Sequence, residues 1–181
     1  MVDARGNAYV NAGGFDLMAG EDFAAGVIAL VRPDGSVTLV ADGLAFPDGM
    51  HIMGDGSTLI VAESYATRLT AFEISRDASL SSRRVWADLG DGVPDGICID
   101  AEDAVWYADV PNERCVRVRE GGEVLDTVAI DRGCFACALG GPDRSTLFIT
   151  ANRWSGPAGM FDGTAGQVLT LPAPAPGAGW P

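Results

Sequence analysis

Two aspartates stand in the same short motif, and their repetition is the first indication of chemistry in this chain. Asp48 lies in Phe46-Pro47-Asp48-Gly49-Met50, and Asp95 lies 47 positions later in Val93-Pro94-Asp95-Gly96-Ile97. Carboxylate oxygens are preferred ligands of hard cations such as Ca²⁺. Two such side chains that converge would form a metal-binding pair. Because Asp before Gly is also common in turns, the alternative is that both residues serve only as turn formers.

The segments around the two motifs are also similar, which predicts a repeated structural unit. A Pro-Asp-Gly turn leads in each case to an apolar, strand-like run, at 58–62 and at 104–108. Fainter copies align Asp3, Met53, Asp100 and Gly140, with spacings of 50, 47 and 40 residues. Periods of roughly 40–50 residues with several strands each are typical of propeller blades. Equivalent places in a radial array converge on its axis, so the two aspartates are expected to meet there.

Frequent short strands without a helical period predict an all-β fold, a β-propeller of about four blades with the first incomplete. The predicted units are a partial one at 1–42 and further ones at 44–90, 93–132 and 134–172. They form one domain, 1–172, followed by a Pro/Ala/Gly-rich tail at 173–181 that is expected to be extended or disordered. The partial first unit suggests a piece of a larger propeller. Its open edges would favour self-association.

Composition excludes several classes of partner. The net charge of −13 argues against nucleic acid, whose phosphates require a basic face. No stretch approaches the length of a membrane span, and no signal-peptide pattern is visible, so a cytoplasmic protein without membrane contact is expected. The spacing of Cys134-Phe135-Ala136-Cys137 is that of redox pairs, yet all four cysteines are expected to be buried free thiols. His51, the single histidine, is expected to be packed rather than catalytic.

Three segments resemble the SMP-30/gluconolactonase/LRE-like family. They are 43–50, Gly166-Gln167-Val168 and, most specifically, the run from Pro94 to Glu102. The resemblance covers nearly all of residues 1–172 and implies a six-bladed propeller that holds one divalent cation at the mouth of its channel. It further implies hydrolysis of lactones or related esters, with this chain corresponding to an N-terminally truncated member.

The resemblance also suggests roles for individual residues. Asp95 matches a metal ligand of the family and is the expected catalytic proton acceptor. Asp48 matches a metal-binding Asn, so it keeps an oxygen ligand and adds a charge. The family's Glu ligand has no counterpart. Asp16, loosely aligned with an acidic residue of the family, is an expected substrate-binding residue. Independently of the resemblance, Glu63 and Asn152 are expected to bind substrate because they end inner strands and could line the channel mouth, with capping of a strand or loop as the alternative. The expected cofactor is Ca²⁺, with Zn²⁺, Mg²⁺ or Mn²⁺ as alternatives.

The function expected from these features is metal-dependent hydrolysis of a sugar lactone or related ester, impaired in a chain that lacks the upstream residues. The expected partner is a small-molecule lactone. The alternative is a non-catalytic calcium-binding or scaffold fragment. A protein-binding propeller is a third class, which would need an exposed apolar patch.

Overall fold

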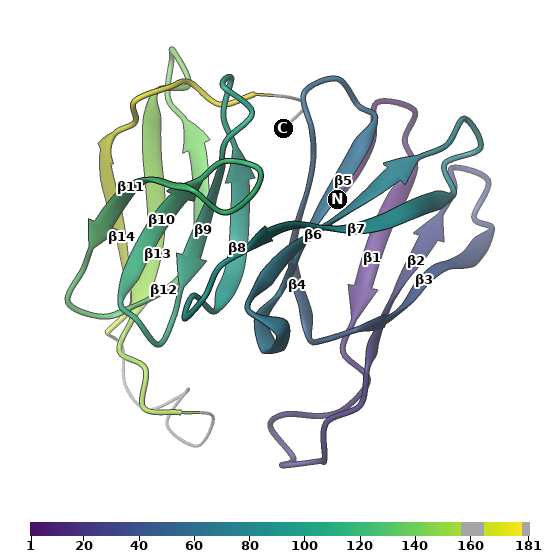
Figure 1. Cartoon of the computed structure of the whole chain (residues 1–181), viewed down its shortest axis with the longest axis horizontal. Helices are drawn as coiled ribbons and strands as arrows, with labels where there is room; N and C mark the ends of the chain where they lie inside the picture. Colours follow the sequence, from purple (N-terminus) through teal and green to yellow (C-terminus); the bar gives the residue numbers. More distant parts are fainter. Residues whose placement is uncertain (157–164, 179–181) are drawn as a thin grey trace.

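The computed structural model describes residues 1–156 and 165–178, and within these the chain is almost entirely β-structure. Its strands form four antiparallel sheets (Figure 1). The single helical element in the described residues is a short 3₁₀ turn, Ser64–Ala66. Within the same residues, no helix has the length and apolarity needed to cross a membrane. The predicted all-β class is therefore confirmed.

In the described residues, the first and last sheets each have three strands, and the two sheets between them have four. The order of neighbouring strands follows the order of the sequence in every sheet. The first sheet contains β1 (Ala8–Ala12), β2 (Gly26–Val31) and β3 (Val37–Leu44). The second contains β4 (Pro47–Ile52), β5 (Thr58–Glu63), β6 (Arg68–Ile74) and β7 (Leu80–Asp88). The third contains β8 (Pro94–Ile99), β9 (Val105–Asp109), β10 (Arg114–Val118) and β11 (Val124–Ala129). The fourth contains β12 (Gly133–Gly140), β13 (Thr146–Asn152) and β14 (Gln167–Pro172).

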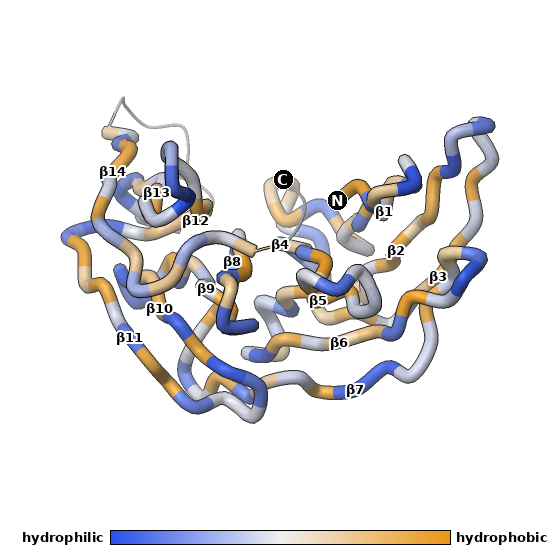
Figure 2. The backbone as a smooth tube through the Cα atoms, turned by 90° about the horizontal axis from the view of Figure 1, so that it is seen from above, coloured by the Kyte–Doolittle hydropathy of each residue, from blue (hydrophilic) through white to orange (hydrophobic). Residues whose placement is uncertain are grey.

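The sheets are arranged along an arc, and one edge strand of each sheet faces the inner side of the arc. Figure 2 shows β4, β8 and β12 on the inner side of the arc and β3, β7 and β11 on the outer side. A separate apolar core fills each space between neighbouring sheets, and alternate residues of one strand enter different cores. Leu59 and Val61 of β5 pack toward the first sheet. Ile60, between them, packs toward the third.

Turn hydrogen bonds confirm that the units are repeats. Asp3 accepts hydrogen bonds from the backbone of Arg5 and Asn7, at 2.8 and 2.9 Å. Asp100, the predicted equivalent of Asp3, accepts them in the same pattern from the backbone of residues 102 and 104, at 2.9 and 3.2 Å. Identical local geometry at aligned positions supports the periodicity that was read from the sequence.

The Pro-Asp-Gly motifs differ from the prediction, because they lie inside strands and are not turns that precede them. Pro47 and Pro94 begin the inner strands β4 and β8. The pairing register shifts between Pro47 and Met50, and again between Pro94 and Ile97, so each Asp-Gly pair forms a bulge. The correction has a physical reason, since Pro is tolerated as the first residue of a strand and Gly often marks a bulge.

The beginning of the tail is bound to the sheets. The backbone N–H of Ala101 donates to the carbonyl of Pro176 at 2.8 Å, and that of Ala178 donates to Ile99 at 3.0 Å. Gly177 is also bridged to Asp100. Residues 173–178 therefore follow the third sheet at the end opposite to the Pro-Asp-Gly motifs, and residues 179–181 lie outside the described part.

Candidate metal centre

The backbone brings Asp48 and Asp95 together because their two inner strands abut at the bulges. A Cβ atom placed on Gly49 would lie 2.5 Å from the carbonyl oxygen of Asp95 and 2.7 Å from the nitrogen of Ile97. Real Cβ atoms do not come so close, so only glycine permits this approach of β4 to β8. The two carboxyl groups consequently share a hydrogen bond. Both side chains are partly buried and so remain open to a small ligand.

The pair has an unusual electrostatic environment. Burial raises the pKa of Asp48 above its ordinary value, and the hydrogen bond with Asp95 partly offsets this. Burial, followed by the charge of Asp48, raises the pKa of Asp95 to about 8. In the described residues no ion pair involves either group. Two close carboxyl groups without a counter-charge tend to hold a shared proton or a bound cation.

The chain's fully buried carboxylates contrast with this pair, because each of them is matched by arginine. Glu63 contacts Arg68 at 2.9 Å and Arg83 at 3.2 Å. Asp109 contacts Arg114 at 2.9 Å, and Asp100 contacts Arg117 at 2.6 Å. An unmatched, partly buried carboxyl pair among so many matched carboxylates is a candidate functional site.

Glu63, one of the predicted substrate-binding residues, has a full set of partners inside the protein. Its side chain is 0% exposed. It accepts hydrogen bonds from the backbone of Ala45 at 2.7 Å and from the hydroxyl of Thr70 at 2.5 Å, in addition to its arginines. Asp109 holds the backbone of Val93 in the same way in the next sheet, at 3.2 Å. Both carboxylates therefore fix the chain just before a Pro-Asp-Gly bulge, and the predicted contact of Glu63 with substrate remains untested.

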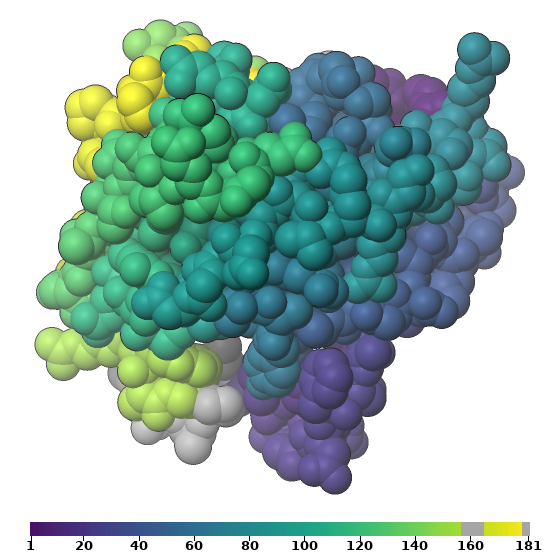
Figure 3. Space-filling model, viewed as in Figure 1, coloured from purple at the N-terminus to yellow at the C-terminus, as the bar shows by residue number. Residues whose placement is uncertain are grey.

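The other two predicted substrate-binding residues lie at the same end of the sheets as the aspartate pair, one on a loop and one at the end of a strand. Asp16 is exposed and accepts hydrogen bonds from the backbone of Met18 and Ala19, at 2.9 and 3.0 Å. Asn152 ends β13, and its side chain accepts a hydrogen bond from the backbone of Arg153 at 2.9 Å. Figure 3 shows the segment after β1 projecting from this end of the molecule. Both residues share an end of the molecule with the aspartate pair, and their contact with a substrate stays a prediction.

Sequence reasoning missed several residues around the pair. The side-chain amide of Asn11 in β1 donates to the backbone carbonyl of Asp48 and so ties the first sheet to the bulge. The hydroxyl of Ser64 donates to the carbonyl of Pro94 at 2.6 Å. Four aromatic rings form a cluster that includes Phe46, just before the Asp48 bulge, with Phe46 stacked on Tyr65 at 4.8 Å between centroids and with Phe15 and Phe23 against them. These contacts join segments that are distant in sequence, so no local pattern could reveal them.

The third bulge of the series carries no acid. In β12 the register shifts between Cys134 and Ala136, which puts Phe135 where the two earlier sheets have Asp. Its ring meets Trp154 edge to face at 5.8 Å. Within the described residues no group of three or more His, Cys, Asp or Glu side chains could hold a metal ion. The described donor set is therefore the two carboxyl groups of Asp48 and Asp95.

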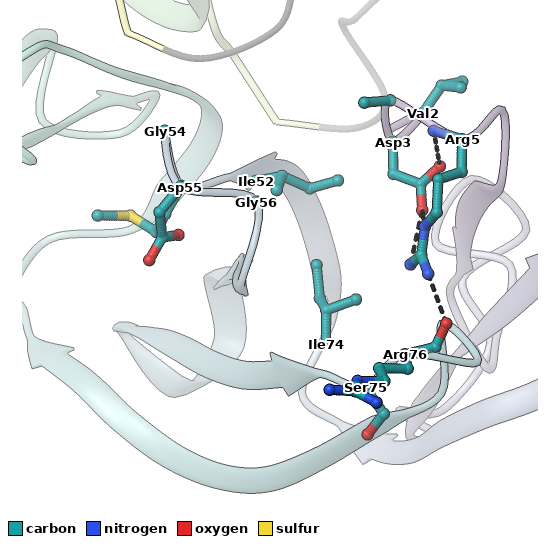
Figure 4. A pocket seen from close by; sticks show the side chains of 12 residues that line it. Val2, Asp3, Arg5, Ile52, Gly54, Asp55, Gly56, Ile74, Ser75 and Arg76 are labelled. Carbon is teal, nitrogen blue, oxygen red and sulfur yellow. Dashed lines mark hydrogen bonds and ion pairs between the residues drawn. The ribbon is translucent and has the colours of Figure 1, made fainter.

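A separate hollow lies at the opposite end of the first two sheets, where side-chain contacts join these sheets to each other. It has a volume of about 670 Å³ and lies between the loop 2–5 and the turns of the second sheet (Figure 4). The guanidinium of Arg5 pairs with Asp3 at 3.2 Å and donates to the carbonyl of Arg76 at 2.5 Å. The guanidinium of Arg5 thus joins the two sheets, whereas Asp55, which also lines the hollow, is exposed and accepts hydrogen bonds locally, from Ser57.

Comparison with known proteins identifies the family of this chain. The architecture is that of a β-propeller, and residues 1–153 match the SMP-30/Gluconolactonase/LRE-like region. The chain belongs to this family. It is 33% identical to regucalcin of Xenopus laevis over 132 residues, which cover 70% of this chain and 44% of that protein. It is 27% identical to pentonolactonase XacC of Haloferax volcanii over 150 residues, 81% of this chain and 50% of that one.

Solved structures have the same fold. A gluconolactonase from Xanthomonas campestris superposes with a TM-score of 0.73 at 26% identity, covering 96% of this chain and 55% of that chain. A calcium-binding protein, regucalcin, from Agrobacterium tumefaciens superposes with a TM-score of 0.78 at 22% identity, covering 99% and 61%. The chain spans about half the length of the curated relatives that it matches. The predicted family and propeller fold are thus confirmed.

Proposed function

We propose that Asp48 and Asp95 are cation ligands in a site that hydrolyses a sugar lactone or a related ester. The observation that carries the proposal is the unmatched carboxyl pair at the meeting point of two inner strands, in a chain whose fully buried acids are matched by arginine. Lactonases among the relatives and structural neighbours support the choice of substrate class.

Two hard oxygen donors held side by side suit a divalent cation, and Ca²⁺ is the proposed ion, since regucalcin neighbours include a calcium-binding protein. Zn²⁺, Mg²⁺ and Mn²⁺ are the alternatives. When bound, such a cation polarises a carbonyl oxygen and lowers the pKa of a water molecule. A cation would also relieve the repulsion that now raises the pKa of Asp95.

Asp95 is the proposed proton acceptor of the reaction. In hydrolysis, water adds to the lactone carbonyl carbon, the ring carbon–oxygen bond breaks, and a hydroxy acid leaves. The attacking water must lose a proton, which the Asp95 carboxylate would receive. Without a cation, burial and the charge of Asp48 raise the pKa of Asp95 to about 8. A bound cation would lower this pKa, so that Asp95 is a carboxylate able to accept the proton at neutral pH. The proposed substrate contacts at the same end are Asp16, which is exposed on the loop after β1, and Asn152, which is half-buried at the end of β13. Glu63 would act indirectly, by fixing the backbone before the bulge.

The donor set also favours a second candidate function. Ca²⁺ usually takes six to eight oxygen ligands, and the described residues supply two carboxyl groups. Residues 1–181 alone are therefore proposed to bind the cation loosely and to hydrolyse lactones weakly, because positioning of the substrate supplies much of the rate gain. A non-catalytic calcium-binding or scaffold module is the alternative function.

The test compares thermal unfolding and lactone hydrolysis with CaCl₂ and with chelator. Ca²⁺ should raise the melting temperature of the wild type, since a ligand that binds only the folded state stabilises it. Asp95→Ala should abolish this shift. Asp48→Asn keeps an oxygen ligand and should retain part of the calcium-induced shift in melting temperature. Asp126→Asn, at an exposed position of β11, is the matched control and should respond like the wild type.

Activity separates the two candidate functions. Chelator-sensitive hydrolysis of gluconolactone above the spontaneous rate, lost in Asp95→Asn, would support the enzyme. A calcium-induced shift without hydrolysis would favour the binding module. If no divalent cation changes the melting temperature, and Asp95→Ala leaves any activity unchanged, the pair is not a metal site.

A further inference from the structure

Two cysteines from neighbouring sheets face each other in the interior. The sulfur of Cys98 in β8 lies 3.7 Å from the sulfur of Cys137 in β12, and 39 positions separate them in the sequence. All four cysteines are free and buried, as predicted. The observed pair is not the one with redox spacing, because Cys134 contacts the carbonyl of Arg132 instead, at 3.9 Å.

The backbones beside this pair are close enough for a covalent link. A Cβ atom on Gly96 would lie 2.7 Å from the Cα of Ala136, so β8 and β12 touch one position from Cys137 and two from Cys98. A disulfide has a sulfur–sulfur distance of about 2.0 Å. The sulfur–sulfur distance of 3.7 Å would therefore have to shorten by about 1.7 Å, a change that side-chain rotation can supply.

The two cysteines are buried, but they lie at the wall of a hollow. Both line a hollow of about 580 Å³ on the inner side of the arc, bounded by β4, β8, β12 and the tail. Cys98 is 5% exposed and Cys137 is 8% exposed, whereas Cys115, the third cysteine of this core, is 0% exposed and does not line the hollow. Access therefore distinguishes the pair from its neighbour.

We propose that Cys98 and Cys137 are a modification site, at which a hydroperoxide forms a reversible disulfide between the inner strands of the third and fourth sheets. One thiolate attacks the peroxide oxygen, which gives a sulfenic acid and releases water or an alcohol. The second thiol then attacks the sulfenic sulfur, and a water molecule leaves. In sum, two thiols and one hydroperoxide give one disulfide, one water and one water or alcohol. The sulfurs are oxidised and the peroxide is reduced.

The environment of the pair sets the conditions for the reaction. The hydrogen bond with Cys137, and then burial, raise the pKa of the Cys98 thiol well above its ordinary value. The hydrogen bond with Cys115 is the main reason that the pKa of the Cys137 thiol is raised as well. Because the thiolate is the nucleophile, oxidation should be slow at neutral pH and faster at alkaline pH. The pair thus differs from an exposed, fast-reacting redox sensor.

Closing the link would fix two sheets to each other next to the candidate metal centre. Cys98 is in the same strand as Asp95, and the thiol of Cys137 contacts the carbonyl of Gly96 at 3.5 Å. A disulfide restricts the unfolded chain by closing a loop, here of about 40 residues, so oxidation should raise the melting temperature by several degrees. Reduction should reverse the change.

The experiment treats the native chain with hydrogen peroxide at pH 8.5, removes the peroxide with catalase, alkylates the remaining thiols and maps the peptides by mass spectrometry. The expected product joins Cys98 to Cys137, leaves Cys115 and Cys134 alkylated after unfolding, and returns to four thiols with dithiothreitol. Cys98→Ala and Cys137→Ala should each prevent both the link and the rise in melting temperature. Cys134→Ala is the matched control and should retain both.

Three results would overturn the proposal. The first is four alkylated thiols after peroxide treatment of the native chain. The second is a link between Cys115 and Cys137, which the close contact of those residues would otherwise allow. The third is a link that forms only in urea. The mapping on the wild type needs no variant, so the proposal is tested even if an alanine substitution prevents folding.

Discussion

At the scale of single residues, the match between acids and arginines separates structural carboxylates from the candidate site. Glu63, Asp100 and Asp109 are each fully buried and each paired with an arginine. Asp48 and Asp95 interact with each other, and among the described residues neither has an arginine partner. The sequence could identify the repeated Pro-Asp-Gly but could not separate these groups. The partners of Glu63 stand 5 and 20 positions away, and no motif joins them to it.

His51 is the residue whose protonation should most clearly affect stability. Its Nε2 atom is buried without a hydrogen-bond partner. Burial, and then the positive charges of Arg144 and of the N-terminal amino group, lower the pKa of His51 from 6.5 to about 4. Between these values the unfolded chain binds one proton more than the folded chain. The contribution of His51 to stability is therefore full above pH 6.5 and is lost as the pH falls through 4.

We expect the free energy of unfolding to fall by on the order of 2–3 kcal/mol from this group between pH 7 and pH 4. His51→Leu removes the group, and it is the chain's single histidine. In urea unfolding, the free energy of unfolding of the wild type minus that of the variant should therefore become smaller, or more negative, as the pH falls from 7 to 4. A difference that stays constant from pH 7 to pH 4 would contradict a buried, neutral His51.

At the scale of elements, the inner strands account for most of the candidate site. The repeat, the strands and the propeller class were all predictable, because each unit must alternate its apolar residues between two cores. The bulges in β4 and β8 were not, since Pro-Asp-Gly is also a turn sequence and only pairing with β5 and β9 settles its position. The aromatic group around Phe46 and the Cys98–Cys137 contact escaped prediction for the same reason: both join separate units.

Gly49 gives a direct test of the contact between β4 and β8. In Gly49→Ala the new methyl group would lie 2.5 Å from the carbonyl oxygen of Asp95, so the two strands must separate. Overpacking of this kind costs about 1–3 kcal/mol. Gly166→Ala is the matched control, because its methyl group would meet nothing within 4 Å and its backbone is not left-handed.

Urea unfolding should show a large loss of stability for Gly49→Ala and a change within about 0.5 kcal/mol for Gly166→Ala. The former should also weaken any calcium-induced rise in melting temperature, because Asp48 and Asp95 move apart. Equal stabilities of the two variants would mean that the close approach of the inner strands does not contribute to the free energy of unfolding.

At the scale of the whole molecule, three apolar cores lie between the four sheets that the described residues form. Among these residues, no further sheet covers the outer face of the first or the last sheet. Both terminal sheets have three strands, and β14 is an edge strand of the last one. Val168 in β14 is 66% exposed. An unpaired edge beside exposed apolar side chains is a template for association with another chain. We therefore propose that the isolated chain self-associates through its terminal sheets.

Sedimentation velocity over a range of protein concentrations should show larger species as the concentration rises. Val168→Lys places a charge on the terminal sheet and should shift the distribution toward monomer, with little loss of stability because the side chain is exposed. Val124→Lys is the matched control, since Val124 is 56% exposed on β11, the outer strand of a four-stranded sheet. It should leave association unchanged if the contact is made by a terminal sheet.

A wild-type chain that remains monomeric at every concentration would show that the arc needs no partner. An equal effect of both lysines would instead locate the contact on the outer strands.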